Sequence, residues 1–261
     1  MKYRIIKALL LQYSLMTIKS LDRIADIVFW PTLSILMWGF TTLFLQKGYN
    51  VNIIGLILAG FIFYQFFQRC QSDIALYLLE DLWSDNLQNV YSTPVTKWDK
   101  LVSLVIFGVL KSLLAFGTAA FLSLVFFKFN LFSYNLTYLF FYFFSLSLFS
   151  IGIGILLVSL VLRFGTNIQM FVWGFSFMLQ PLIAVFYPVS ILPVFLQKIS
   201  LLIPATYVFE GLRGLRESGI FDYGEFFYSI FLNLILIIIA CVLYAMAFSH
   251  NKKTGRLVHS N

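Results

Sequence analysis

FFYSIFLNLILIIIACVLYAMAFS, residues 226–249, decides the fold class of this chain. The stretch contains no Asp, Glu, Lys or Arg, and it is longer than the roughly 20 helical residues that cross a hydrocarbon core about 30 Å thick. Its apolar residues are continuous, whereas those in a strand of an outer-membrane barrel alternate with polar ones. The sequence therefore predicts a membrane-spanning helix here.

The rest of the chain has a similar composition. Of its 261 residues, 61% are hydrophobic and 11% are charged, and the mean hydropathy is +0.90. Soluble domains carry about 25% charged residues, so a soluble domain, a disordered chain and a secreted disulfide scaffold are excluded. Six spans are predicted: 27–46, 48–68, 101–127, 129–162, about 167–187 and 226–249. No repeat or linker divides residues 1–261, which we expect to form one all-α polytopic membrane domain.

The distribution of Lys and Arg predicts the orientation. With the N-terminus inside, most basic residues outside the spans fall on the cytoplasmic side, as the positive-inside rule requires. We therefore expect the chain to lie in the inner (cytoplasmic) membrane, with both termini on the cytoplasmic side. Residues 1–23 mix basic and apolar side chains, which suits a helix lying at the inner interface. The net charge of +7 then indicates contact with anionic membrane lipids, and nucleic acid is not an expected partner.

The longest cytoplasmic segment, 71–100, is predicted to hold a short helix that projects from the membrane. Ile74, Leu78 and Leu82 recur at helical spacing opposite acidic residues. The helix should end before Thr93 and Pro94, since the residue before a proline disfavours helix. A docking element for a cytoplasmic partner and a solvated loop are both compatible with this pattern. The candidate coupling residues are Glu80, Asp81, Asp85, Thr93 and Pro94.

Prolines follow the fifth predicted span. Pro181, Pro188, Pro193 and Pro204 interrupt the chain, and residues 188–206 are expected to form a broken or re-entrant section. Irregular backbone at membrane depth is tolerated only where protein or a wet cavity shelters it. The section is thus a candidate gate or cavity rim, with an ordinary surface loop as the alternative.

Lys111 is the one charge that falls well inside a predicted span. An ammonium at the bilayer centre costs about 2.5 to 3.5 kcal/mol on the insertion scale. We expect Lys111 to face the bundle or a cavity, where it meets an anionic substrate or a polar neighbour. If the span begins later, the side chain snorkels to the interface instead.

The sequence lacks common motifs for nucleotide binding, metal binding and nucleophilic catalysis. It has no Gly-x-x-x-x-Gly-Lys-Ser/Thr loop for nucleotide phosphates, no His-Glu-x-x-His metal site and no Gly-x-Ser-x-Gly nucleophile elbow. All carboxylates are predicted to lie outside the spans, which leaves proton or sodium coupling without an obvious residue. Cys70 and Cys241 lack metal-type spacing and are predicted to be packing residues. No catalytic residue, metal site or bound cofactor is therefore expected.

Three stretches together resemble the type-two permeases of ATP-binding-cassette exporters. The first is Phe29-Trp30-Pro31 with Trp38-Gly39, and the second is Ser92-Thr93-Pro94-Val95 with Asp99. The third, YPVSILPVFLQKISLLIPATYVFEGLRGL, occupies residues 187–215 and carries a Pro-x-Thr-Tyr before an acidic residue and an arginine.

This resemblance implies a permease subunit that works as a homodimer or with a related permease. A separate nucleotide-binding subunit would bind ATP and Mg²⁺ and dock on residues 71–100, and lipid-like, drug-like or saccharide cargo would leave the cytoplasm. Residues 188–215 would form the outer gate. The gate candidates are Pro188, Pro193, Pro204, Tyr207, Glu210 and Arg213. A stand-alone channel or secondary carrier, and a membrane enzyme or assembly factor, are the alternatives.

Overall fold

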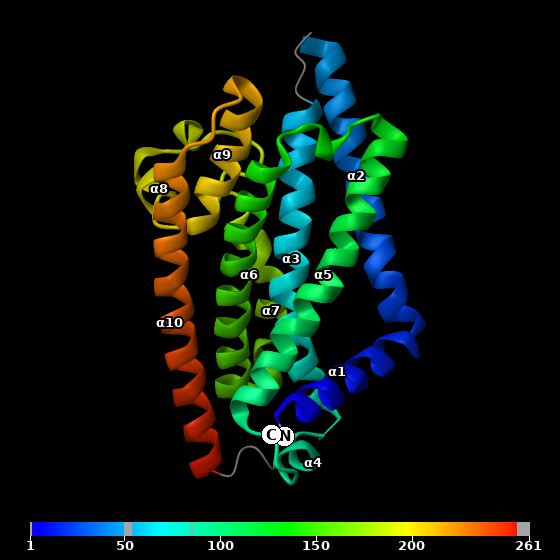
Figure 1. The fold of residues 1–261 in the computed structure, drawn as a ribbon, viewed down its shortest axis with the longest axis vertical. Helices are drawn as coiled ribbons and strands as arrows, with labels where there is room; N and C mark the ends of the chain where they lie inside the picture. The colour runs from blue at the N-terminus through cyan, green and yellow to red at the C-terminus, as the bar shows by residue number, and fades with distance from the viewer. Residues whose placement is uncertain (1, 50–53, 85, 255–261) are drawn as a thin grey trace.

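The structure is a computed structural model that describes residues 2–49, 54–84 and 86–254, and in these residues it is helical without strands (Figure 1). The α-helices are α1 (Lys2–Ile18), α2 (Leu21–Tyr49), α3 (Ile54–Trp83), α4 (Leu87–Tyr91), α5 (Lys97–Phe127), α6 (Leu136–Phe164), α7 (Gln169–Leu179), α8 (Val194–Ser200), α9 (Pro204–Ser218) and α10 (Tyr223–Thr254). Three short 3-10 helices, η1 (Leu131–Ser133), η2 (Gly165–Ile168) and η3 (Val189–Ile191), lie between them.

Four helical segments are long and apolar enough to cross a membrane. They are Leu21–Lys47, Lys97–Phe127, Leu136–Leu179 and Tyr223–Lys253. The third overlaps two of the predicted spans, 129–162 and 167–187, and is interrupted at η2, where Gly165 adopts a φ of +67°. Of the predicted span 48–68, residues 54–68 fall in α3, residues 48–49 end α2 and residues 50–53 lie outside the described residues. Helix α3 is not among the four segments found in the described residues.

Helix α3 is the central element of the bundle and contacts α2, α5, α6, α7 and α9. Two glycines allow neighbouring helices to approach it: a Cβ on Gly108 of α5 would lie 2.6 Å from Ile74 Cγ1, and one on Gly154 of α6 would lie 2.7 Å from Ile74 Cδ1. Small residues at such contacts are typical of membrane helix packing. Protein therefore covers α3 on several sides.

The predicted projecting helix in 71–100 is wrong for its first part. Residues 71–83 continue α3 into the bundle, and Ile74, Leu78 and Leu82 are all buried there. The expected helix break is confirmed, because Thr93 and Pro94 lie in the turn between α4 and α5. Thr96 then starts α5 with a capping box to Asp99.

Helix α1 lies at the same end of the bundle as α4 and the C-terminal end of α10 (Figure 1). It is shorter than the interfacial helix predicted for residues 1–23, since α2 already begins at Leu21. The side chain of Tyr13 is fully buried, and the Thr17 and Tyr77 hydroxyls share a hydrogen bond of 2.7 Å. Helix α1 therefore packs mainly on α5, and this hydrogen bond joins it to α3.

The proline-rich section lies at the opposite end (Figure 1). Between α7 and α9 the chain forms only η3, the short α8 and irregular backbone, with Ala184 at a φ of +55°. Pro204 occupies the first turn of α9, where its missing N–H is not needed. The predicted interruption of regular structure by prolines is thus confirmed.

Candidate functional site

The strongest concentration of charge is an ionic core between α2, α3 and α5, formed by Asp26, Arg69, Asp73 and Lys111. Lys111 Nζ lies 2.9 Å from Asp73 Oδ1 and 3.8 Å from Asp26 Oδ2. Arg69 binds both oxygens of Asp26, with Nη1 donating at 3.0 Å. Two cations and two carboxylates compensate one another, so the core is formally neutral.

Further ion pairs extend from this core toward α1. Lys100 of α5 pairs with Asp81 of α3, and both side chains are almost completely buried. Asn86 Nδ2 donates to the other oxygen of Asp81 at 3.0 Å. Arg23 Nη2 lies 3.0 Å from Glu80 Oε2 nearer the surface. Together these pairs link α2, α3 and α5 by contacts between residues far apart in sequence.

The ionic residues of α3 share one helix face. Arg69, Asp73, Tyr77 and Asp81 recur at a spacing of four, which places their side chains in one row. The aromatic ring of Tyr77 lies below Lys111, with the ammonium 5.5 Å from the ring centroid. This spacing is visible in the sequence and was the signal that sequence analysis missed.

Removing a charge from water costs several kcal/mol per ion unless a partner compensates it, which is why each buried charge here has a counter-ion. Asp73 and Asp81, which were expected outside the spans, are buried between helices of the bundle. Nor are the candidate coupling residues on an exposed acidic face: Asp81 is buried and Glu80 is occupied by Arg23. Asp85 lies outside the described residues. Lys111 faces the bundle, as expected, and its contact is a protein carboxylate.

The other two coupling candidates are exposed. Thr93 and Pro94 line a groove of about 480 Å³ between α1 and α4. Leu9 and Val90 supply apolar surface there, and Gln12, Asn86 and Asn89 supply amides. Helix α4 is held to α10 by the Tyr91 ring, whose centroid lies 5.2 Å from that of Phe248, and burial raises the pKa of the Tyr91 hydroxyl. The groove is an open surface on elements anchored to the bundle.

The gate candidates form a second cluster, the outer cap, which we define as residues 181–216. Glu210 accepts a hydrogen bond of 2.6 Å from the Val189 N–H, directly after Pro188, and its other oxygen lies 2.8 Å from Arg213 Nη1. Arg213 Nη2 donates to the Ala184 carbonyl at 2.9 Å. Residues from the loop and from α9 are therefore joined through a single ion pair.

Two side-chain hydroxyls bind backbone carbonyls elsewhere in the outer cap. Thr206 and Tyr207 each donate a 2.7 Å hydrogen bond to a carbonyl, at Ser200 and Leu201 respectively. Pro193 directly precedes α8 and Pro204 opens α9. The structure thus brings the predicted gate residues into one segment, in which side chains satisfy irregular backbone.

No group of His, Cys, Asp and Glu residues suited to a metal ion occurs in the described part of the chain. Cys70 is buried and Cys241 is half-buried, each as a free thiol. Comparison of the sequence with protein-family models and with curated proteins found no match.

Proposed function

We propose that this chain is the membrane-spanning permease subunit of an ATP-driven exporter in the cytoplasmic membrane. In this proposal α2, α3, α5, α6, residues 167–187 with α7, and α10 supply six spans, and α1 lies at the inner interface with both termini in the cytoplasm. A second permease, identical or related, completes the pathway. Residues 188–215 act as its outer gate.

The observation that carries the proposal is the groove between α1 and α4, together with its connections. An ATPase subunit can drive a membrane subunit only by pressing on a surface that transmits force to the spans. From this groove, Asn86 leads to Asp81 and Lys100, and α1 leads through Thr17 to Tyr77. A push on the groove would therefore move α3 and α5 together.

The sequence supports a division of labour between subunits. Without a phosphate-binding loop the chain has no usual means to hydrolyse ATP. ATP and Mg²⁺ would be held by the partner, and the chain itself would bind neither. The cargo would be lipid-like, drug-like or saccharide, as the resemblance to type-two permeases implies.

A proton-coupled secondary carrier is the second candidate, and the ionic core is the observation that favours it. Asp73 is buried, and its Oδ2 atom has no hydrogen-bond partner in the described structure. Intramembrane carboxylates paired with Lys or Arg occur in proton relays. A proton on Asp73 would release Lys111, which is the kind of event that couples a gradient to movement.

Site-directed crosslinking tests the exporter. A cysteine is placed at Asn89 in the groove, and a matched control cysteine at Ser133 at the opposite end, both in a Cys241→Ser chain. In native membranes we expect Asn89→Cys to crosslink a cytoplasmic protein that hydrolyses ATP, while Ser133→Cys does not. Equal labelling of both positions, or no ATPase at the groove, would contradict the proposal.

Reconstitution into vesicles distinguishes the proton-coupled carrier from the exporter. Vesicles containing only this chain are given a proton gradient without ATP, and internal pH is followed with a trapped dye. The exporter proposal predicts no proton flux above empty vesicles. Flux that Asp73→Asn abolishes and Lys252→Gln leaves intact would establish the carrier instead.

A further inference from the structure

A groove of about 640 Å³ lies between the C-terminal parts of α6 and α10. The two helices run in the same direction and end where α1 lies (Figure 1). One face of each helix lines this α6–α10 groove, at spacings of three, four and seven residues. The lining residues that matter here are Leu156, Leu160 and Arg163 of α6, and Leu243, Met246 and Lys253 of α10. The groove therefore follows the helix axes, and its basic residues lie at the helix ends.

The two walls of the groove are fixed to each other. Near the helix ends, Asn251 Nδ2 of α10 donates a hydrogen bond to the Leu162 carbonyl of α6. Farther along, a Cβ on Gly152 of α6 would lie 2.9 Å from Leu236 Cδ2, a close approach typical of membrane helices. The groove is thus a built feature of the surface, and neither helix has to move to form it.

The part of the groove away from the helix ends is apolar. Leu243 and Met246 are 42% and 63% exposed, and Leu156 and Leu160 are half-buried. Both helices belong to segments that are long and apolar enough to cross a membrane, where exposed apolar side chains contact acyl chains. Leu156 precedes Arg163 by seven residues, which is about 10 Å along the helix. This surface therefore fits the first part of an acyl chain that lies along the groove.

Two cations lie where the groove reaches the helix ends. Arg163 is in the last turn of α6, and Lys253 is in the last turn of α10 and ends the candidate span Tyr223–Lys253. Neither side chain forms an ion pair or a hydrogen bond within the described part of the chain, and no residue that lines the groove is acidic. His250 also lines the groove and already has an interaction within the protein. The charge offered to a ligand therefore comes from Arg163 and Lys253.

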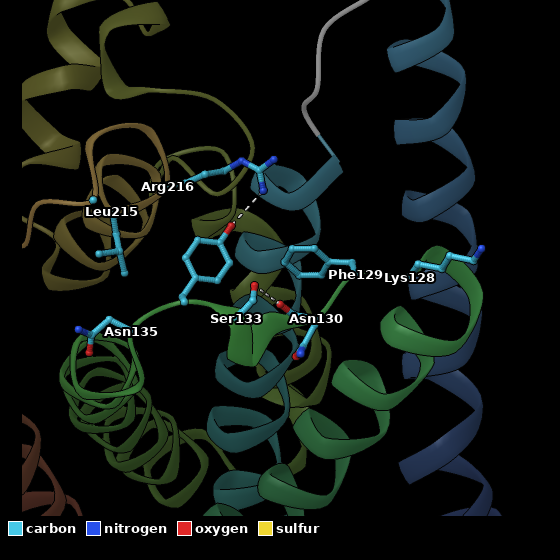
Figure 2. Close-up of a pocket in the computed structure, with 9 residues that line it drawn as sticks. Lys128, Phe129, Asn130, Ser133, Asn135, Leu215 and Arg216 are labelled. Carbon is cyan, nitrogen blue, oxygen red and sulfur yellow. Dashed lines mark hydrogen bonds between the residues drawn. The ribbon is translucent and has the colours of Figure 1, made fainter.

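A cavity of about 650 Å³ at the opposite end of the bundle provides a contrast (Figure 2). It too is lined by two cations, Lys128 and Arg216. Figure 2 shows Lys128 and the Asn135 amide pointing away from Arg216, which donates to the Tyr134 hydroxyl at 3.0 Å. The polar groups of that cavity do not converge, whereas the two cations of the α6–α10 groove end one continuous apolar surface.

We propose that the α6–α10 groove binds an anionic phospholipid. One acyl chain lies along Leu156, Leu160 and Met246, and the headgroup phosphate lies between Arg163 and Lys253. Long basic side chains at the end of a span extend toward the headgroup layer, and basic pockets between membrane helices bind anionic headgroups. The guanidinium donates to the phosphate oxygens, and the ammonium adds a second charge. The site requires neither an ATPase nor a proton gradient, so it stands apart from both functions considered above.

Native mass spectrometry of the full chain in detergent tests this proposal. The delipidated protein is titrated with phosphatidylglycerol and, separately, with the zwitterionic phosphatidylcholine. We expect tighter retention of phosphatidylglycerol, and a loss of about fivefold in its affinity in Arg163→Gln and in Lys253→Gln, the scale of one basic residue at an anionic surface. Lys252→Gln is the matched control, because it removes the same charge from the same turn of α10 but does not line the groove. It should bind phosphatidylglycerol as the parent does.

Two further observations guard against a folding artefact. Arg163, Lys252 and Lys253 are exposed, so the three variants should have the parent's thermal unfolding midpoint when no lipid is added. Lys253→Arg keeps the charge and should retain the lipid. Equal retention of the two lipids by the parent, or unchanged affinity in both groove variants, would overturn the assignment. An equal loss in Lys252→Gln and Lys253→Gln would also overturn it, since net charge at the helix end would then hold the lipid.

Glycerol 1-phosphate distinguishes the source of the phosphate, because it carries the group without acyl chains. At millimolar concentration it should leave bound phosphatidylglycerol in place. Displacement would assign the groove to a soluble phosphate compound and refute the lipid proposal.

Discussion

The two ends of the bundle are held together in different ways. At the end near α1, side chains pair with side chains: Lys111 with Asp73, and Lys100 with Asp81, join helices distant in sequence. In the outer cap, side chains bind the backbone of their own segment, as Arg213 does at Ala184 and Thr206 does at Ser200. The first arrangement couples several helices, and the second makes one segment a unit.

This difference teaches where movement is easiest. Separating α3 from α5 would expose uncompensated buried charges, so these helices should move as one body. The outer cap keeps its internal bonds if it shifts as a whole. A shift of the outer cap as a unit, with α2, α3 and α5 staying together, should therefore cost the least.

The largest effect is expected when a buried charge loses its partner. Asp73→Leu leaves Lys111 with Asp26, at 3.8 Å, as its remaining carboxylate partner in the described structure, and we expect a loss of about 3 to 5 kcal/mol in the free energy of unfolding. Denaturant unfolding of the detergent-solubilised protein measures this. The double variant Asp73→Leu/Lys111→Met, which removes both charges, should recover most of the loss. A single variant as stable as the parent would show that the ionic core does not couple the helices.

An intermediate and local effect is expected in the outer cap. Arg213→Gln removes the Glu210 pair and the bond to Ala184, and should cost about 2 kcal/mol. Hydrogen exchange should rise in residues 181–203 and stay unchanged in residues 69–83, with Arg213→Lys intermediate. Exchange that rises equally at both ends would erase the distinction between them.

The smallest effect is expected for the ion pair nearest the surface. Arg23 and Glu80 retain 25% and 11% side-chain exposure, and solvent-screened pairs of this kind contribute about 0.2 to 1 kcal/mol. Arg23→Gln should therefore lower the unfolding midpoint only slightly, and added salt should reduce the difference from the parent. A loss as large as that of Asp73→Leu would place Arg23 in the buried core.

Helix α10 was predictable because its stretch of apolar residues is unbroken, and hydropathy alone identifies such a helix. For α3 the span 48–68 was predicted, but not the continuation of the same helix to Trp83, since hydropathy assumes that every face meets lipid. Arg69 and Asp73 are tolerated because neighbouring helices shield and neutralise them. A one-dimensional window cannot register that compensation, and so it gave no sign that the helix runs on from residue 68 to Trp83.

In the outer cap, sequence gave part of the site. The spacing of three between Glu210 and Arg213 places both on one helix face, and they form an ion pair there. Their backbone partners at Val189 and Ala184 were hidden, because any residue supplies an N–H or a carbonyl. A contact to a main-chain group does not depend on which side chain that residue carries, so the sequence does not reveal it.

The shared ion pairs of α3 bear on biosynthesis. As the chain emerges, Asp26, the partner of Arg69, is made first, whereas Asp73 is made well before Lys111, its neutralising neighbour on α5. Until α5 follows, α3 has no complete shield and should remain at the insertion machinery instead of partitioning alone. We therefore expect α3 and α5 to leave the insertion machinery together, with α2 held next to them until they do.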